Sequence, residues 1–222
     1  MGTDQAAPKL ELEDIQSIIL RRRPSPYYGC HVLLKINEAS QGRELLQKIQ
    51  PYVLSAAEYA RQDTWMAVVI TYTGLIALQV PEVSLESFPT AFRDGMAARA
   101  SNVGDTGQSA PEHWDRPYGT GDIHVALTLL STTNDIFQAN LEKARAVLAS
   151  LPGVTVLARE DFAQTPEERT PFGYKDGISF PNIVGNSVSP IVDEEEQLPR
   201  ESLSSAIRAR QDGCWRCRSL IC

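Results

Sequence analysis

The stretch from Asp122 to Arg159 (DIHVALTLLSTTNDIFQANLEKARAVLASLPGVTVLAR) decides the fold. Its first part, Asp122 to Leu130, is an apolar run typical of a buried β-strand. A helix capped by Asn134 and ended by Pro152-Gly153 is predicted next. The helix prediction rests on apolar residues that recur at helical spacing: Phe137, Leu141, Ala144, Leu148 and Leu151. Val154 to Arg159 predicts a further strand.

The residues before this stretch also predict a strand, a helix and a second strand. Gly29 to Ile36 and Trp65 to Thr73 are apolar runs that predict strands, and Gly42 to Gln50 carries the apolar stripe of a helix. A short docking helix is predicted within Leu10 to Leu20. The resulting β-α-β-β-α-β order is that of a ferredoxin-like α+β fold, one antiparallel sheet with helices on one face.

Charge and hydropathy exclude some classes of function. The chain has 222 residues with 28 acidic and 21 basic side chains, a net charge of −7, which argues against a nucleic-acid-binding surface. No run approaches the ~20 apolar residues that a membrane span needs. We therefore expect a cytoplasmic protein with no nucleic-acid or membrane partner.

The cysteines and the last residues form an unusual tail. Only Cys30 lies in the first 213 residues, whereas Cys214, Cys217 and Cys222 crowd the end, which is not a disulfide framework. The C-x-x-C spacing of Cys214 and Cys217 lacks the second pair of a zinc site. From Leu198 onward the composition changes abruptly to arginine- and serine-rich, so we interpret residues 198–222 as a disordered tail.

The three histidines are scattered along the chain. His31 and His124 lie in predicted strands, where a packed or hydrogen-bonded role is more common than metal ligation. His113 lies in a loop with no second ligand at metal-binding spacing. The residues alone predict no metal site.

One segment stands apart, Thr170 to Pro181 (TPFGYKDGISFP). Gly173 and Gly177 flank Asp176 and predict a turn that presents a single carboxylate. An Asp-Gly pair also occurs in ordinary turns, so spacing leaves open whether Asp176 is functional or merely a turn residue.

The segment resembles the G-x-x-D-G motif of the dye-decolorising peroxidases, through Gly173 to Gly177 followed by Ile178 to Pro181. Phe180 stands where the family usually has glutamine. Other stretches resemble the family in the same order: Asp14-Ile15-Gln16, Thr71 to Leu75, Gly95 to Arg99, Gly104 to Gly107 and Pro111 to Trp114. The resemblance runs from about Asp14 to about Glu196.

This resemblance implies a haem b peroxidase built from two ferredoxin-like halves. It implies that Asp176 accepts the first proton of H₂O₂, that Gly177, Ile178 and Ser179 lie with it against the haem, and that dyes or phenols are oxidised. The family's proximal histidine comes from the second half, and no histidine follows His124 here. We therefore expect the chain to be a truncated N-terminal part, inactive alone.

The same reasoning predicts four parts of the chain. They are an arm with a short helix (1–28), a ferredoxin-like domain (29–160) with a long insertion (74–121), a distal haem loop (161–197) and the tail. Two other functions stay open: a non-catalytic ferredoxin-like binding or assembly module, and a haem carrier or iron-releasing protein. A homo-oligomer is also expected as a possible state of the protein.

Overall fold

The computed structural model describes residues 10–20, 26–58, 63–164, 169, 172–175 and 183. Four strands, β1 (Tyr28–Ile36), β2 (Thr64–Ile70), β3 (Val125–Ser131) and β4 (Val154–Ala163), form one sheet in the order β2-β3-β1-β4. Every neighbouring pair is antiparallel. The predicted ferredoxin-like arrangement is confirmed.

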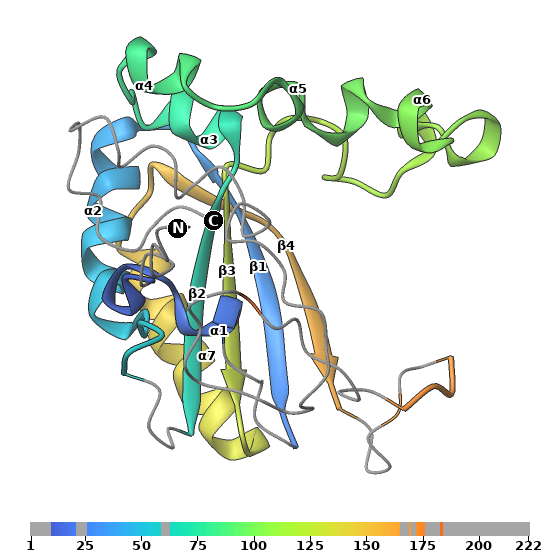
Figure 1. Cartoon of the computed structure of the whole chain (residues 1–222). Helices are drawn as coiled ribbons and strands as arrows, with labels where there is room; N and C mark the ends of the chain where they lie inside the picture. Colours follow the sequence, from blue (N-terminus) through green and yellow to red (C-terminus); the bar gives the residue numbers. More distant parts are fainter. Residues whose placement is uncertain are drawn as a thin grey trace, which may run out of the picture.

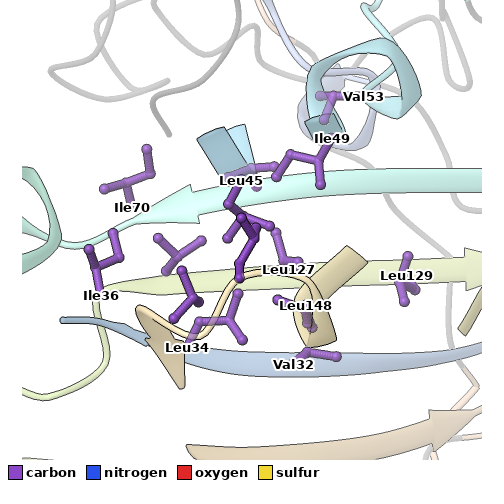
Figure 2. Packing of buried hydrophobic residues seen from close by; sticks show 14 of the residues in the cluster. Val32, Leu34, Ile36, Leu45, Ile49, Val53, Ile70, Leu127, Leu129 and Leu148 are labelled. Atoms are coloured by element: carbon purple, nitrogen blue, oxygen red, sulfur yellow. The ribbon is translucent and has the colours of Figure 1, made fainter. Parts of the chain in front are cut away.

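Two helices cover one face of the sheet (Figure 1). These are α2 (Ala39–Ile49) after β1 and α7 (Asn134–Ala149) after β3. Side chains alternate between the two faces of a strand, so every second residue of β1 and β3 points at the helices. The core that results is mainly aliphatic and buried (Figure 2), and includes Val32, Leu34, Ile36, Leu45, Ile49, Leu127, Leu129 and Leu148.

The opposite side of the sheet, here called the second face, follows from the strand register. Ala67, Thr128, His31 and Glu160 form a row across the four strands. The row toward one end consists of Trp65, Leu130, Gly29 and Phe162, and the row toward the other end of Val69, Ala126, Leu33 and Ala158. The second face is thus apolar and aromatic, with polar groups concentrated in its middle row.

A β-bulge interrupts the pairing of β1 with β4. Leu33 is opposite Ala158, but Leu34 is opposite Val156, which leaves Leu157 without an opposite residue. Residues of β4 after the bulge therefore change faces relative to those before it. Val154 joins the core under the helices, whereas Ala158, Glu160 and Phe162 lie on the second face.

The ends of two predicted elements are wrong, because side chains of threonine cap helices there. Strand β2 ends at Ile70 rather than Thr73, since the Oγ1 atom of Thr71 accepts a hydrogen bond from the backbone N–H of Gly74 and begins α3 (Tyr72–Ala77). Helix α7 is capped by Thr133 rather than Asn134, because Oγ1 of Thr133 accepts a hydrogen bond from the backbone N–H of Ile136.

The predicted N-terminal helix is also wrong in detail. The segment forms the 3₁₀ turn η1 (Leu12–Asp14) and the short helix α1 (Ser17–Leu20), separated by extended backbone at Ile15. Gln16 forms a β-bridge with Ser55 at this point, so tertiary pairing overrides the helical periodicity. The turn η2 (Gln50–Tyr52) follows α2.

The insertion at 74–121 is not a plain loop. It contains short helices, which are the rest of α3, α4 (Glu82–Glu86), α5 (Thr90–Ala98), α6 (Ala100–Val103), η3 (Gly107–Ser109) and η4 (Pro111–His113). These helices gather beyond one end of the sheet, and α5 and α6 extend away from it (Figure 1). Among the residues described, no helix has the length and apolarity of a membrane span.

Candidate functional site

Arg169 and residues 172–175 form the approach to Asp176. Arg169 and Lys175 are paired in an antiparallel bridge, and Nη1 of Arg169 donates a hydrogen bond to the carbonyl oxygen of Gly173, 2.7 Å away. Gly173 has φ +86°, in the left-handed region that residues with a Cβ avoid. This backbone conformation explains why glycine stands at position 173, while the rest of the predicted turn, from Asp176 on, lies outside the described residues.

The turn exposes two aromatic side chains next to the predicted catalytic residue. Phe172 is 88% exposed and Tyr174 is 75% exposed. Asp176, Gly177, Ile178 and Ser179 lie outside the described residues, as does the tail at 198–222, so the roles given to them stay predictions.

The middle row of the second face holds a hydrogen-bonded histidine. Nδ1 of His31 lies 2.9 Å from Oγ1 of Thr128 on the neighbouring strand. The imidazole ring packs on Phe162 with the ring centres 4.6 Å apart, and Tyr27 meets the same phenyl ring edge-on. His31 is therefore a positioned side chain, as predicted for a strand histidine, held between a hydroxyl and an aromatic ring.

The charge state of His31 is set by its surroundings. Burial lowers its pKa below the ordinary value, because the charged imidazolium loses hydration, and the carboxylate of Glu160 in the same row opposes this shift. The lowered pKa favours the neutral ring, in which one nitrogen is a donor and the other an acceptor. The middle row thus combines a neutral imidazole, a hydroxyl and a carboxylate.

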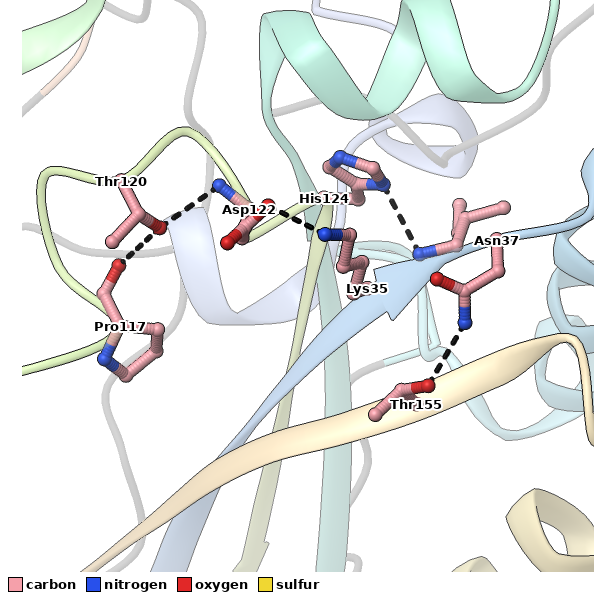
Figure 3. A network of polar contacts seen from close by, with 8 residues as sticks. Lys35, Asn37, Pro117, Thr120, Asp122, His124 and Thr155 are labelled. Atoms are coloured by element: carbon pink, nitrogen blue, oxygen red, sulfur yellow. Dashed lines mark hydrogen bonds and ion pairs between the residues drawn. The ribbon is translucent and has the colours of Figure 1, made fainter.

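A second polar cluster ties the insertion to the end of the sheet (Figure 3). Nζ of Lys35 on β1 lies 2.7 Å from Oδ1 of Asp122, and this hydrogen bond holds the pKa of the Asp122 carboxyl below its ordinary value. The backbone N–H of Ile36 donates to Nδ1 of His124, 3.0 Å away. Burial also lowers the pKa of His124, consistent with a neutral ring that accepts this bond.

The same cluster fixes the first helix of the insertion. Thr71, which caps α3, donates a hydrogen bond from its Oγ1 atom to the carbonyl oxygen of Ile123, 2.7 Å away. Its backbone N–H donates to the carbonyl oxygen of His124. Gly74 passes so close to the carbonyl of His124 that an added Cβ would lie 2.1 Å from the oxygen. The beginning of the insertion is therefore held against Ile123 and His124, which are themselves held against β1 through Lys35 and Ile36.

Two of the described side chains of metal-binding type, His124 and Cys30, are in states that do not favour binding of iron. Nδ1 of His124 is already an acceptor for Ile36, and burial raises the pKa of the Cys30 thiol to about 11, so it is not the thiolate that binds iron. His31 is engaged by Thr128, on a different part of the sheet from His124. Within the described ranges, no three His, Cys, Asp or Glu side chains gather as a metal site.

Comparison with known families identifies the fold. The family model for the DyP dimeric alpha+beta barrel domain matches residues 14–157. No curated protein matches the sequence significantly.

Solved structures share the same architecture. A fungal DyP-type peroxidase from Auricularia auricula-judae has 21% identity and a TM-score of 0.73 over 88% of this chain and 43% of its own. An ancestral D-type dye decolorizing peroxidase has 22% identity and a TM-score of 0.69 over 86% and 43%. A further DyP structure has 24% identity and a TM-score of 0.67 over 80% and 39%. The chain thus spans about two fifths of the solved structures that it matches.

Sequence reasoning missed the partners that position these groups. Thr128 and Glu160 became neighbours of His31 only through the register of three strands, and a one-residue bulge decides which face β4 presents. The contact between Lys35 and Asp122 joins residues far apart in the sequence. The only sign of these partners in the sequence was the alternation of polar with apolar residues within the predicted strands.

Proposed function

Because the chain belongs to the family of the DyP dimeric alpha+beta barrel domain, we propose that it forms the N-terminal half of a haem-dependent peroxidase that uses H₂O₂ to oxidise dyes, phenols or similar reductants. The observation that carries this proposal is the family match over residues 14–157, followed in the same chain by the G-x-x-D-G motif at Gly173 to Gly177. The cytoplasmic location remains a prediction from the sequence.

In this proposal Asp176 moves the protons. An aspartate side chain is ionised over most of the pH range, so its carboxylate can accept a proton from H₂O₂ and return it to the oxygen that leaves as water. The turn that precedes Asp176 supports this role, because Arg169 and the left-handed Gly173 fix the backbone three residues before the carboxylate. Gly177, Ile178 and Ser179 complete the proposed haem-side loop.

Haem b, when bound, would supply the redox chemistry. We propose that the axial histidine comes from a C-terminal half of the family, because no histidine of this sequence follows His124. The part played by this chain is then the proton-transfer group and one wall of the site. The 222-residue chain alone is expected to bind haem poorly and to turn over no substrate.

The test is a version of the chain completed with a C-terminal half of the family, compared with its Asp176→Asn variant. The variant should keep the haem absorption spectrum but react with H₂O₂ about 10²–10⁴-fold more slowly in stopped-flow measurements, because an amide cannot accept the proton. Lys175→Gln, a neighbouring charge change, is the matched control and should react at the parent rate. An unchanged rate in Asp176→Asn would remove Asp176 from the mechanism.

The chain Met1 to Cys222 alone, purified with haem supplied, separates the alternatives. Little haem and no dye oxidation are expected. Near-stoichiometric haem with sustained turnover would overturn the division of the site between two halves. Haem that passes to an acceptor protein without turnover would indicate a carrier, and a completed chain without haem or activity would indicate a binding module.

A further inference from the structure

Gln16 makes an unusual contact with the outer edge of β2. Its Nε2 atom donates to the carbonyl oxygen of Val68, 2.8 Å away, and its Oε1 atom accepts from the backbone N–H of the same residue, 2.9 Å away. The Gln16 residue is 2% exposed and Val68 is fully buried. Both backbone groups of one strand residue are therefore satisfied by a single side chain from 52 residues away.

This contact has the chemistry of strand pairing. A residue on a neighbouring strand would offer one N–H and one C=O to Val68, and a primary amide offers the same pair. Outward-facing backbone groups come from every second residue of a strand, so the next outward position is Met66, which is bridged to Val53. Two successive positions of the β2 edge are occupied without a fifth strand.

The segment that carries Gln16 is anchored on both sides of it. The backbone N–H of Ser17 donates to the carbonyl of Leu54 at 2.8 Å, and that of Ala56 donates to the carbonyl of Ile15 at 2.7 Å. Apolar side chains of residues 10–20 are buried around Ala56, and Ile18 packs against Trp65 and Leu130. Residues 10–20, here called the strap, thus run along the β2 edge and reach the second face.

The two edge strands of the sheet, β2 and β4, differ in how easily another strand could pair with them. Strand β2 (TWMAVVI) has no charged residue and no proline, and sequences of this kind pair readily with another copy of themselves. Strand β4 carries Arg159, Glu160 and Asp161 in succession. Charged side chains in succession on an edge strand hinder its pairing with another strand, because pairing would take them out of water.

We propose that the strap is a protective device in which Gln16 closes the β2 edge against strand addition by a second copy of this chain. Charge protects the β4 edge, and the amide of Gln16 protects the β2 edge. The device is independent of haem and of peroxidase activity, since it rests on contacts within residues 10–70.

Gln16→Ala tests the proposal in the full chain. Amide hydrogen exchange at Val68 should become about tenfold faster, the factor expected for one lost hydrogen bond, and self-association should begin at lower protein concentration in sedimentation velocity. Gln47→Ala, on the exposed surface of α2, is the matched control and should change neither. Faster exchange at Val68 without increased association would overturn the protective role, as would unchanged exchange.

Gln16→Glu keeps the proposal testable if the alanine variant does not fold. An ionised carboxylate cannot donate to the carbonyl of Val68, but the protonated form offers one donor and one acceptor, as the amide does. Association should exceed that of the parent at neutral pH and return toward the parent level as acid protonates the introduced carboxylate. Association that does not depend on this protonation would contradict a role for the paired hydrogen bonds.

Discussion

The helix-covered face of the sheet and the second face are filled by different kinds of side chain. Aliphatic residues such as Leu34, Leu127 and Leu129 fill the first and pack against α2 and α7. The second face places a glycine under an aromatic ring and a hydroxyl beside an imidazole, at Gly29 with Phe162 and Thr128 with His31. The helix-covered face therefore stabilises the fold through the volume of closely packed side chains. The second face depends on the fit of ring to glycine and on a hydrogen bond, features suited to a site.

The largest effect is expected from a cavity under the helices. Leu127→Ala removes a fully buried side chain from the centre of β3 and should lower the free energy of unfolding by about 2–5 kcal/mol. Urea unfolding followed by circular dichroism would measure it. Val69→Ala, on the same sheet but partly exposed on the second face, is the control and should cost clearly less; equal losses would show that the two faces do not differ in packing.

An intermediate effect is expected where the second face depends on shape. A Cβ at position 29 would lie 2.6 Å from the carbonyl oxygen of Leu129 and 2.7 Å from the ring of Phe162. Gly29→Ala should therefore lower the free energy of unfolding by about 1–3 kcal/mol through overpacking.

Adding Phe162→Leu to Gly29→Ala should recover part of this loss, because the smaller side chain leaves room for the methyl group. Urea unfolding of the single and double variants measures the coupling. Strictly additive losses would show that the ring does not occupy the space over Gly29.

The smallest effect is expected from the pH dependence of His124. Its pKa is lower in the folded protein, so below about pH 6.5 the unfolded chain takes up a proton first and stability falls with falling pH. His124→Asn keeps an acceptor near the Nδ1 position for Ile36 and cannot be protonated there. Urea unfolding between about pH 7.5 and 5 should show a weaker pH dependence in this variant, and an unchanged dependence would assign it to other groups such as His31.

The sequence predicted the fold but not the contacts across it. Apolar runs such as Val125 to Leu130 and the stripe of α7 depend on local periodicity, which a sequence displays directly. The break in the helix at Gln16 depends on a partner strand 52 residues away. The early end of β2 at Ile70 depends on the threonine cap of α3. Asp176 was found by a motif, of which the structure describes the backbone only up to Lys175, so its role stays a prediction.

The unpaired Leu157 has a consequence for how the length of β4 can vary. Every other residue from Val154 to Ala163 has an opposite residue on β1, so removing one of them would shift the rest of the strand and exchange its faces. Deleting Leu157 alone leaves all existing pairs intact. Position 157 is therefore the one place within β4 where natural variation or engineering can shorten the strand while Glu160 and Phe162 keep their orientation.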